Sequence, residues 1–282
     1  MVDRSEQRRK AEEFLALHSS DEMLILPNAW DVASKEIFER EGFKAIGTTS
    51  AGVAATLGHA DGEKMTLADN LQVVKRIADN TALPVSADME AGYAESIEGL
   101  ADTAEAVLAT GAVGLNIEDS TGDPRVPLFD KNHQKDKIRA VRATSKSSGV
   151  HLVINARTDV YLLDGDVKQQ LQHAIERGNL YRDAGADCIF VPDVGNLDKS
   201  SMKVLVREID APVNVIAGAT TPAVAELQGI GVARLSLGPR PMRALFDLLR
   251  SMARELIASG TYGQMASPVI SYDEVNGWFS RS

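Results

Sequence analysis

The sequence predicts an α/β fold in the form of a (β/α)8 barrel, also called a TIM barrel. Short apolar runs alternate with amphipathic helical patterns along the chain, and a glycine often separates a helical pattern from the next run. Such alternation gives parallel strands joined by right-handed crossovers. Eight strand–helix units in about 250 residues are typical of this barrel. The predicted strands lie near residues 24, 45, 85, 113, 151, 188, 212 and 234.

The first elements show the alternation clearly. A charged helical segment over residues 1–18 precedes the apolar strand LILPN, and the next helical pattern runs from Val32 to Gly42. Later helical patterns end at Gly111, Gly185 and Gly231, because glycine adopts the left-handed conformation that closes a helix. The strands are near-continuous apolar runs, which fits a sheet covered on both faces. A doubly wound open sheet is the alternative, but LPNAWD stands where its glycine-rich fingerprint would follow strand one.

We expect a single domain over residues 1–282, consisting of the barrel, an N-terminal helix and a C-terminal helical tail. No linker or low-complexity segment interrupts the chain. The tail from residue 241 onward is longer than closure of a barrel requires. It carries an apolar helical stripe that is available to pack on another subunit: Met242, Leu245, Phe246, Leu249, Met252, Leu256.

Composition excludes several classes of protein. The chain has 44% hydrophobic and 25% charged residues, as an ordinary soluble globular protein does. Its net charge of −10 argues against a nucleic acid or an anionic membrane as partner, although a local Arg or metal ion can still attract a small anionic substrate. The single cysteine, Cys188, excludes an intramolecular disulfide and fits a reducing cytoplasm. The sequence shows no signal-peptide core and no membrane-spanning apolar run.

The stretch VSADMEAG, residues 85–92, carries the first chemical signal. Asp88 and Glu90 are two residues apart, so a strand would place both carboxylates on one face. Like charges side by side at a strand end need compensation, and a hard divalent cation with oxygen ligands is the simplest source. The alternative is a solvated turn that happens to be acidic.

In barrels of this kind the chemistry lies at the carboxyl ends of the strands. Acids gather after strands two to four, and Arg157 is the one strong cation at these ends. Acids facing one small volume are costly without a cation. This indicates Mg²⁺ or Mn²⁺ held by carboxylates and waters, with Arg157 opposite to hold a carboxylate or phosphate bidentately. Asp119 and Asp159 are interpreted as helix N-caps. The strand ends also supply candidate substrate-binding residues: Trp30, Thr49, Ser50, Ala51, Gly52, Asn214.

Four segments resemble the phosphoenolpyruvate mutase/isocitrate lyase superfamily in their order and spacing: TTSAGVAATLGHAD, SADMEAGYA, GLNIED and NARTDVY. The resemblance runs from about residue 26 to residue 238. It implies a (β/α)8 barrel whose last helix is swapped between neighbouring subunits of a homodimer or homotetramer. It also implies Mg²⁺ or Mn²⁺ chelated by a small α-keto or α-hydroxy carboxylate substrate, and chemistry through an enolate.

The resemblance further implies roles for individual residues. Asp88, which matches the direct metal ligand, also contacts the substrate that chelates the ion. Three acids match residues that reach the metal through water: Asp61, Glu90, Glu118. Glu90 stands where many members carry a second Asp. One loop matches the loop whose backbone N–H groups hold the substrate carboxylate or enolate oxygen: Ser50, Ala51, Gly52. Arg157 matches the arginine that clamps the substrate, and with Glu118 and Asp61 it forms the expected catalytic set.

The loop after strand four departs from the family pattern. Lyases that cleave isocitrate-like substrates carry Lys-Lys-Cys-Gly-His there, and the thiol is the acid that quenches the enolate. Residues 120–130 contain no cysteine, and Cys188 lies in an apolar strand as a core residue. The Lys and Asn of the mutase gating loop are not recognisable. Arg125 and His133 are the candidates that this segment offers for a cationic or titratable group. Its Gly and Pro content fits a lid that excludes water.

Three functions remain open at this point. The first is a lyase that breaks a carbon–carbon bond of an oxaloacetate- or malate-like diacid, with a metal stabilising the enolate. The second is a mutase or hydrolase of phosphoenolpyruvate or phosphonopyruvate, which needs a second anion site for the phosphoryl group. The third is a metabolite-binding protein without turnover. The missing loop partners rank the mutase below the lyase.

Overall fold

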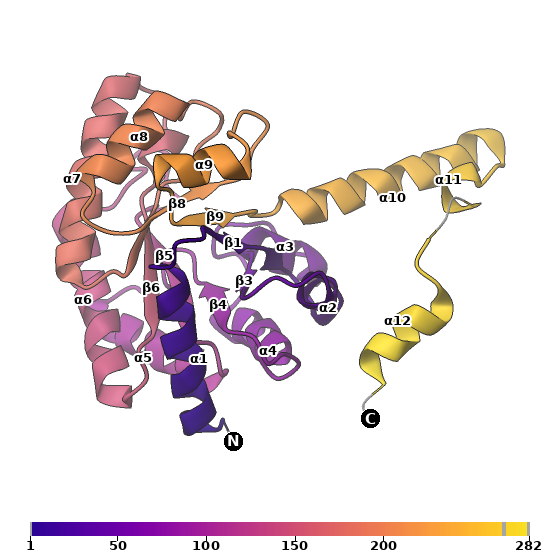
Figure 1. Cartoon of the computed structure of the whole chain (residues 1–282), viewed down its shortest axis with the longest axis horizontal. Helices are drawn as coiled ribbons and strands as arrows, with labels where there is room; N and C mark the ends of the chain where they lie inside the picture. Colours follow the sequence, from indigo (N-terminus) through magenta and orange to yellow (C-terminus); the bar gives the residue numbers. More distant parts are fainter. Residues whose placement is uncertain (1, 267–268, 281–282) are drawn as a thin grey trace. The chain divides into compact units, whose positions relative to one another are not determined.

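The computed structural model describes residues 2–266 and 269–280 (Figure 1). Its strands form one parallel sheet in the order β1-β9-β8-β7-β6-β5-β4-β3-β2. The strand bounds are β1 Leu24–Leu26, β2 Asn28–Ala29, β3 Ile46–Thr48, β4 Val85–Asp88, β5 Gly114–Glu118, β6 Val153–Arg157, β7 Cys188–Phe190, β8 Val213–Ile216 and β9 Arg234–Ser236.

Pro27 divides the first predicted strand into β1 and β2. β1 pairs with β9 and β2 pairs with β3, so two consecutive segments of the chain form the two ends of the sheet. Proline has no N–H to donate, but the Pro27 carbonyl accepts a hydrogen bond from the Gly47 N–H (2.8 Å). The predicted parallel α/β barrel is therefore confirmed as a nearly closed, TIM-barrel-like sheet whose first strand is in two pieces.

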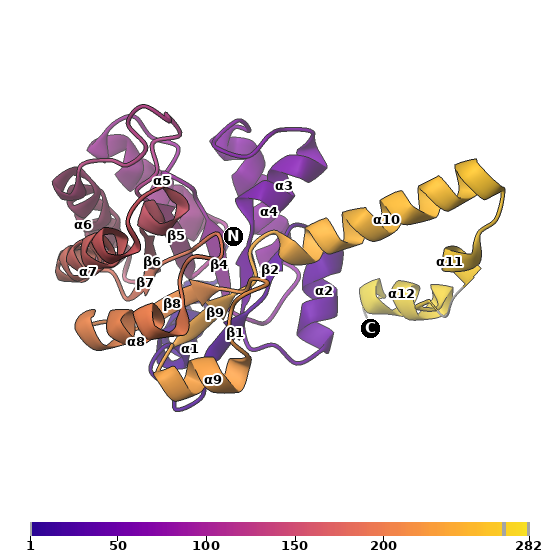
Figure 2. The ribbon, with the colours of Figure 1, turned by 90° about the horizontal axis from the view of Figure 1, so that it is seen from above.

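Helices pack around the outside of the strands, as Figures 1 and 2 show. Glycines in the left-handed conformation close several of them, among them Gly185 (φ 110°) and Gly231 (φ 95°), as their positions in the sequence predict. The bounds are α1 Arg4–Leu17, α2 Val32–Arg40, α3 Ser50–Leu57, α4 Leu67–Ala78, α5 Ile97–Ala109, α6 Lys131–Ser148, the 3-10 helix η1 Asp159–Leu162, α7 Val167–Ala184, α8 Lys199–Glu208 and α9 Val224–Ile230.

Helix α1 closes the amino end of the barrel. Its Phe14 is fully buried and lies against Gly114 at the start of β5, where a Cβ atom would be only 2.6 Å from the Phe14 ring. The Gln7 amide donates to the carbonyls of Leu108 (2.8 Å) and Ala112 (2.9 Å), which precede β5. The absence of a side chain at Gly114 thus lets an aromatic ring seal this end, and the opposite end remains for chemistry.

The chain consists of two compact units, Met1–Gly238 and Pro239–Ser282. The second unit contains α10 Arg240–Ser259, α11 Gly263–Ala266 and α12 Tyr272–Phe279. Its longest helix exposes apolar side chains, including Leu249 (63%) and Ile257 (90%). The exchange of this helix between subunits and the single-domain organisation both stay predictions. In the part of the chain that the structure describes, no helix is long and apolar enough to cross a membrane.

Candidate active site

Asp88 lies at the carboxyl end of β4 and is buried. Its backbone is held on both sides, because its N–H donates to the Thr48 hydroxyl (2.8 Å) and its carbonyl accepts from the Asn70 amide (3.1 Å). One carboxylate oxygen, Oδ2, accepts a hydrogen bond from the Ser50 N–H (2.9 Å). The other, Oδ1, is buried, and no described residue donates to it. A rigidly held carboxylate thus keeps one oxygen available to a ligand.

The segment predicted as a substrate-binding loop, residues 50–52, is the first turn of α3. The first N–H groups of a helix have no acceptor within it and favour a negative charge. Asp88 takes the N–H of Ser50, and the N–H groups of Ala51 and Gly52 follow in the same turn. The turn thus presents backbone donors beside Asp88, and their contact with a substrate carboxylate stays a prediction.

Gly52 allows α3 to approach the end of β2. A Cβ atom at this position would lie 2.7 Å from Thr49 Cγ2 and 2.8 Å from Trp30 Cβ. Trp30 and Thr49 are both buried, and Thr49 is the N-cap residue of α3 without a capping bond from its own side chain. In this structure the two side chains pack against the first turn of α3 at Gly52. Their contact with a substrate stays a prediction.

Glu90 joins Asp88 by a different route from the one the sequence pattern predicts. β4 ends at Asp88, and Glu90 has a left-handed backbone (φ 47°), so the two acids do not share a strand face. Glu90 Oε2 accepts from the Glu63 N–H (2.7 Å), and Oε1 accepts from the Tyr93 hydroxyl (2.5 Å). Burial raises the pKa of Glu90, and the charge of Asp88 adds to the rise. The turn after β4, rather than strand periodicity, brings this acid into the cluster.

Asp61 lies in the turn between α3 and α4, on the same side of the site. Partial desolvation raises the pKa of its carboxyl, and the charge of Asp88 raises it further. Hydrogen bonds from the Ser50 hydroxyl and the Gly62 N–H act in the opposite direction and lower the pKa. The predicted acids are thus near enough to influence one another's ionisation. Asp61 is the one of the four that is exposed to solvent, since the other three are buried or half-buried.

Arg157, at the end of β6, is already paired with two carboxylates. Its Nη1 lies 2.7 Å from Glu118 Oε2, and its Nε and Nη2 donate to the two oxygens of Asp159 at 2.5 and 2.9 Å. Burial raises the pKa of Glu118, and Asp159, Asp88 and Glu90 add to the rise while Arg157 opposes it. β5 and β6 place Glu118 and Arg157 in register as neighbours. The bidentate face that we expect to hold a substrate therefore holds Asp159 in this structure.

Asp119 and Asp159 are not the N-caps of the following helices, which corrects the interpretation from the sequence. The N-cap of α6 is Asp130, and the N-cap position of η1 is Thr158. The fully buried Asp119 accepts from the Asp159 N–H (2.9 Å) and from Arg177 (2.9 Å). The Asp119 carboxylate is thus held by Arg177 from the distant helix α7, and the Asp159 carboxylate is held by Arg157, two residues before it.

Residues 120–130 form the loop between β5 and α6. Arg125 is exposed and paired with Asp123 (2.7 Å). The base of the loop is firmly held: the Phe129 N–H donates to the Asp119 carbonyl (2.8 Å), and Arg177 donates to the Phe129 carbonyl (3.0 Å). His133 lies within α6 rather than in the loop. Farther out, the Thr121 N–H donates to the Pro127 carbonyl across the loop (3.0 Å), and a role as a lid stays a prediction.

Two further residues that the sequence singles out lie inside the barrel. Asn214, on β8, is fully buried and donates to the Ser236 hydroxyl (3.0 Å). Cys188 on β7 is also fully buried, and burial raises the pKa of its thiol to about 12, so it is a core residue as expected. Asn214 as a substrate-binding residue stays a prediction.

The donor set fits a hard cation through one direct protein ligand. Within residues 2–266 and 269–280, no three Asp, Glu, His or Cys side chains are grouped so as to hold a metal ion by themselves. The orphaned oxygen of Asp88 suits one direct bond, and carboxylate oxygens are the ligands that Mg²⁺ prefers, with several waters retained. Burial away from water raises the pKa of each of the remaining acids, and the charge of Asp88 adds to each rise: Asp61, Glu90, Glu118.

Two residues of the site do not follow from the sequence pattern. Tyr93 contacts Glu90 through its hydroxyl, and Glu63 contributes its N–H to Glu90 and its carboxylate to the Tyr93 N–H (2.7 Å). Tyr93 lies in the segment SADMEAGYA, so a signal for it is present in the chain. Both Tyr93 (φ 53°) and Glu63 (φ 55°) have left-handed backbones, which no local pattern of ordinary residues predicts.

The sequence pattern of the phosphoenolpyruvate phosphomutase family matches residues 14–257. This chain belongs to the phosphoenolpyruvate mutase/isocitrate lyase superfamily. Among its relatives, an uncharacterised protein of Mycobacterium tuberculosis is 35% identical over 270 residues, which cover 92% of this chain and 97% of that one. The 2-methylisocitrate lyase of Salmonella typhimurium is 30% identical over 216 residues, or 74% of this chain and 71% of the enzyme.

Solved structures of the superfamily show the same fold. A protein of Burkholderia cenocepacia J2315, provisionally assigned as a lyase/mutase, aligns with a TM-score of 0.90 and 31% identity over 98% of each chain. A 2,3-dimethylmalate lyase aligns with a TM-score of 0.83 over 95% of this chain and 94% of that one; at 24% identity it supports the fold alone. Lyases and mutases on small carboxylates both occur in the superfamily, and the fold does not separate the two branches.

Proposed function

We propose that this chain is a Mg²⁺-dependent carbon–carbon lyase, or an Mn²⁺-dependent one, acting on a small α-keto or α-hydroxy carboxylate through an enolate. The observation that carries the proposal is that the two carboxylate oxygens of Asp88 have different surroundings. One of its oxygens accepts a hydrogen bond from the start of α3, and the other is buried among three further acids and accepts from no residue that the structure describes. That arrangement suits a cation and a chelating anion on the same side.

The residues of the chain would bind and orient the substrate. The N–H groups of Ala51 and Gly52 suit the substrate carboxylate, because helix starts favour negative charge. Arg157 suits the other end of the substrate, once it exchanges the carboxylate of Asp159 for that of the substrate. Glu118 is the acid that would hold a proton near that end, since burial raises its pKa. A bound divalent cation supplies positive charge for the developing enolate.

The lyase is favoured over the mutase by two observations. A relative that covers most of the chain is named a 2-methylisocitrate lyase, and a second, from Eubacterium barkeri, is named a 2,3-dimethylmalate lyase (25% identity over 276 residues). In addition, a mutase needs a second cationic group for the phosphoryl, whereas Arg157 is shared between two carboxylates and Arg125 is exposed at the loop surface. Phosphoenolpyruvate or phosphonopyruvate chemistry is the second candidate, because the matching family pattern bears that name.

The absence of a cysteine from residues 120–130 narrows the range of expected substrates. An enolate formed by cleavage must be protonated, and a general acid contributes roughly 10²- to 10⁴-fold to rate. We expect isocitrate and 2-methylisocitrate to be poor substrates for this reason. Small β-keto diacids, whose enolates solvent can protonate, should be better.

The test is product release with Mg²⁺ across isocitrate, 2-methylisocitrate, 2,3-dimethylmalate, oxaloacetate and phosphonopyruvate. Asp88→Asn should abolish activity while it keeps an acceptor for the Ser50 N–H, and Asp79→Asn, at an exposed ion pair at the end of α4, is the matched control that should keep it. Turnover of phosphonopyruvate alone would replace the lyase by the mutase. Tight oxalate binding without any turnover would replace both by a metabolite-binding protein.

A further inference from the structure

The barrel interior contains a cation that is not needed to hold any nearby acid. Arg234 opens β9 and is fully buried. Its guanidinium reaches the Ser236 hydroxyl (3.3 Å), the Asn116 amide oxygen (3.4 Å) and His18 Nε2 (3.4 Å), and all three partners are neutral groups at pH 7. A buried charge without a counter-charge in contact is costly. The cost indicates that Arg234 serves something beyond packing.

Arg234 and Asp88 lie in the same barrel, on strands β9 and β4, which do not pair with each other. Asn116, which accepts from Arg234, is the register partner of Asp88 on the neighbouring strand. Burial lowers the pKa of Arg234 to about 10, whereas Cys188 and Asp88 act to raise it. The guanidinium therefore remains charged at neutral pH. The interior around it is polar instead of aliphatic, with buried oxygens at Ser86 and Asn155 that no described residue satisfies. This interior is nevertheless shielded from bulk water, so a charge in it acts more strongly on its surroundings than it would in water.

The charge balance of the site explains the need for this cation. Four acids gather at the carboxyl end of the barrel: Asp61, Asp88, Glu90, Glu118. The guanidinium of Arg157 is shared between Glu118 and Asp159, so these three groups together keep a net negative charge. Arg234 acts on the cluster from the buried interior, where a substrate cannot displace or neutralise it.

We infer that Arg234 is an electrostatic positioning residue: a fixed charge in the barrel interior that favours anionic substrate at the Asp88 site and opposes the metal cation. The inference rests on the proposed function, because it concerns the same site. Its signature is a pair of opposite effects. Removing the charge should tighten Mg²⁺ and weaken an anionic ligand, whereas damage to the fold weakens both.

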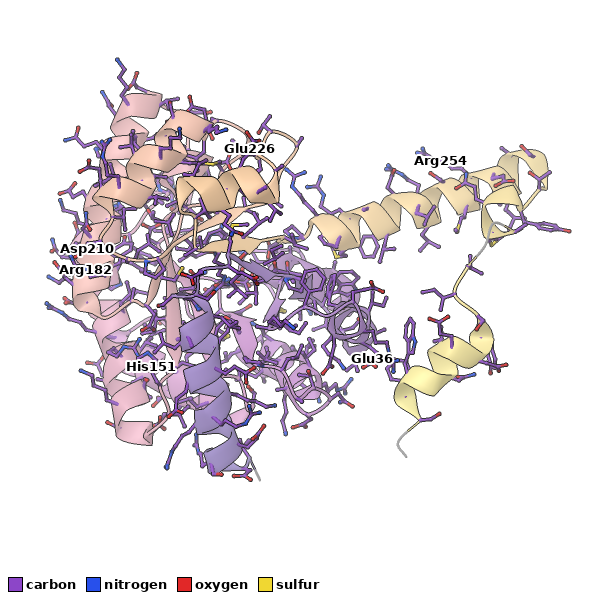
Figure 3. All side chains as sticks on the ribbon, in the orientation of Figure 1. Glu36, His151, Arg182, Asp210, Glu226 and Arg254 are labelled. Carbon is purple, nitrogen blue, oxygen red and sulfur yellow. The ribbon has the colours of Figure 1, made fainter. Side chains whose placement is uncertain are left out.

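The other charged groups near Arg234 do not account for it. His18 has its pKa lowered to about 4 by burial and by Arg234 itself, and it is therefore neutral at pH 7. The Asp187 carboxylate is committed to Arg142, to the Ile154 N–H (2.7 Å) and to His151 (2.8 Å), which is labelled in Figure 3. Asp88 is thus the acid whose negative charge interacts favourably with Arg234.

The experiment compares wild type with Arg234→Met, an apolar replacement of similar length, and Arg234→Lys, which keeps a charge. Calorimetry gives the Kd for Mg²⁺ on metal-free protein and the Kd for oxalate at saturating Mg²⁺. We expect Arg234→Met to bind Mg²⁺ more tightly and oxalate more weakly, each by roughly five- to thirty-fold, the size expected for one charge within a barrel radius. Arg234→Lys should restore most of both affinities. Lys35→Met, which removes another fully buried cation, on α2, is the control and should leave both unchanged.

Several outcomes overturn the inference, and they are distinguishable from failure of the proposed function. Weakening of both ligands, no change in either, or no rescue by lysine would each assign Arg234 a structural role. If Arg234→Met does not fold, Arg234→Gln takes its place; if only the lysine variant folds, the charge is structural and the inference is wrong. Wild-type protein that binds neither Mg²⁺ nor oxalate would instead remove the proposed function, and the inference with it.

Discussion

His18 should make the protein sensitive to mild acid. The ring lies at the end of α1 and is 3% exposed; its Nδ1 is 2.8 Å from the Phe14 carbonyl. That contact makes Nδ1 the protonated nitrogen, so Nε2 faces the Arg234 guanidinium as an acceptor. Protonation of Nε2 would place a second cation against the first in a buried site. Burial and Arg234 together therefore lower the pKa of His18 to about 4.

The magnitude follows from linkage between protonation and unfolding. The folded pKa of about 4 lies below the ordinary value of 6.5, so the unfolded chain binds more protons between these pH values. Stability is therefore fully present above pH 6.5 and is lost as the pH falls toward 4. At pH 5 the loss relative to pH 7.5 should be about 2 kcal/mol from this one side chain.

The assay is urea unfolding at pH 7.5 and pH 5 for wild type and His18→Gln. The change in unfolding free energy between the two pH values should be about 2 kcal/mol smaller in the variant. His173→Gln, at an exposed histidine on α7, controls for the simple loss of a titratable group and should behave as wild type. Equal pH dependence of wild type and His18→Gln would refute the reasoning, whatever the absolute stability of the variant.

Three further predictions concern the site and the assembly. Asp88→Ala should abolish Mg²⁺ binding by calorimetry with little change in the melting of the metal-free protein, because loss of the bond to Ser50 is offset by relief of repulsion; unchanged Mg²⁺ affinity would misplace the metal site. Arg157→Lys should keep Mg²⁺ binding but lose roughly 10- to 100-fold in kcat/KM, since one ammonium cannot copy a bidentate fork, and retained turnover would remove this residue from the site. The exposed apolar stripe of α10 should support a homodimer or homotetramer that Leu249→Asp dissociates, and light scattering that finds a monomer of 30.3 kDa for wild type would contradict this.

The alternation of apolar runs and helices is sufficient to predict parallel strands joined by helices, because the strands are short and buried and Gly or Pro lies shortly before several of them. The split of strand one is not predictable from the run itself. Pro27 belongs to an apolar stretch, and only the two neighbouring strands show that each half of the stretch has a different partner. Closure of a barrel is a property of distant pairings and has no local signature.

The site shows the same division between local and distant causes. Asp88 and the first turn of α3 follow from motifs that are continuous in the chain. The sequence pattern predicts a shared strand face for Asp88 and Glu90, whereas a left-handed turn after the strand brings Glu90 near Asp88. It misses the partner of Arg157, because Asp159 is two residues away and resembles a cap. Nothing in the sequence around Arg234 marks it as more than a strand residue, because its partners His18 and Asn116 come from distant elements.

The position of β1 at one end of the sheet has a consequence for the protein during its synthesis. β1 ends at Leu26, and the strand that pairs with it, β9, ends at Ser236. A ribosome that adds roughly 5 to 20 residues per second needs about 10 to 40 seconds to make the chain between them. For that time the nascent chain carries an open strand edge of the kind that recruits other chains. The contact between His18, at the end of α1, and Arg234 also cannot form until β9 has been synthesised. A translational pause before β9 has emerged from the ribosome should therefore raise aggregation of the nascent chain far more than an equal pause after it has emerged.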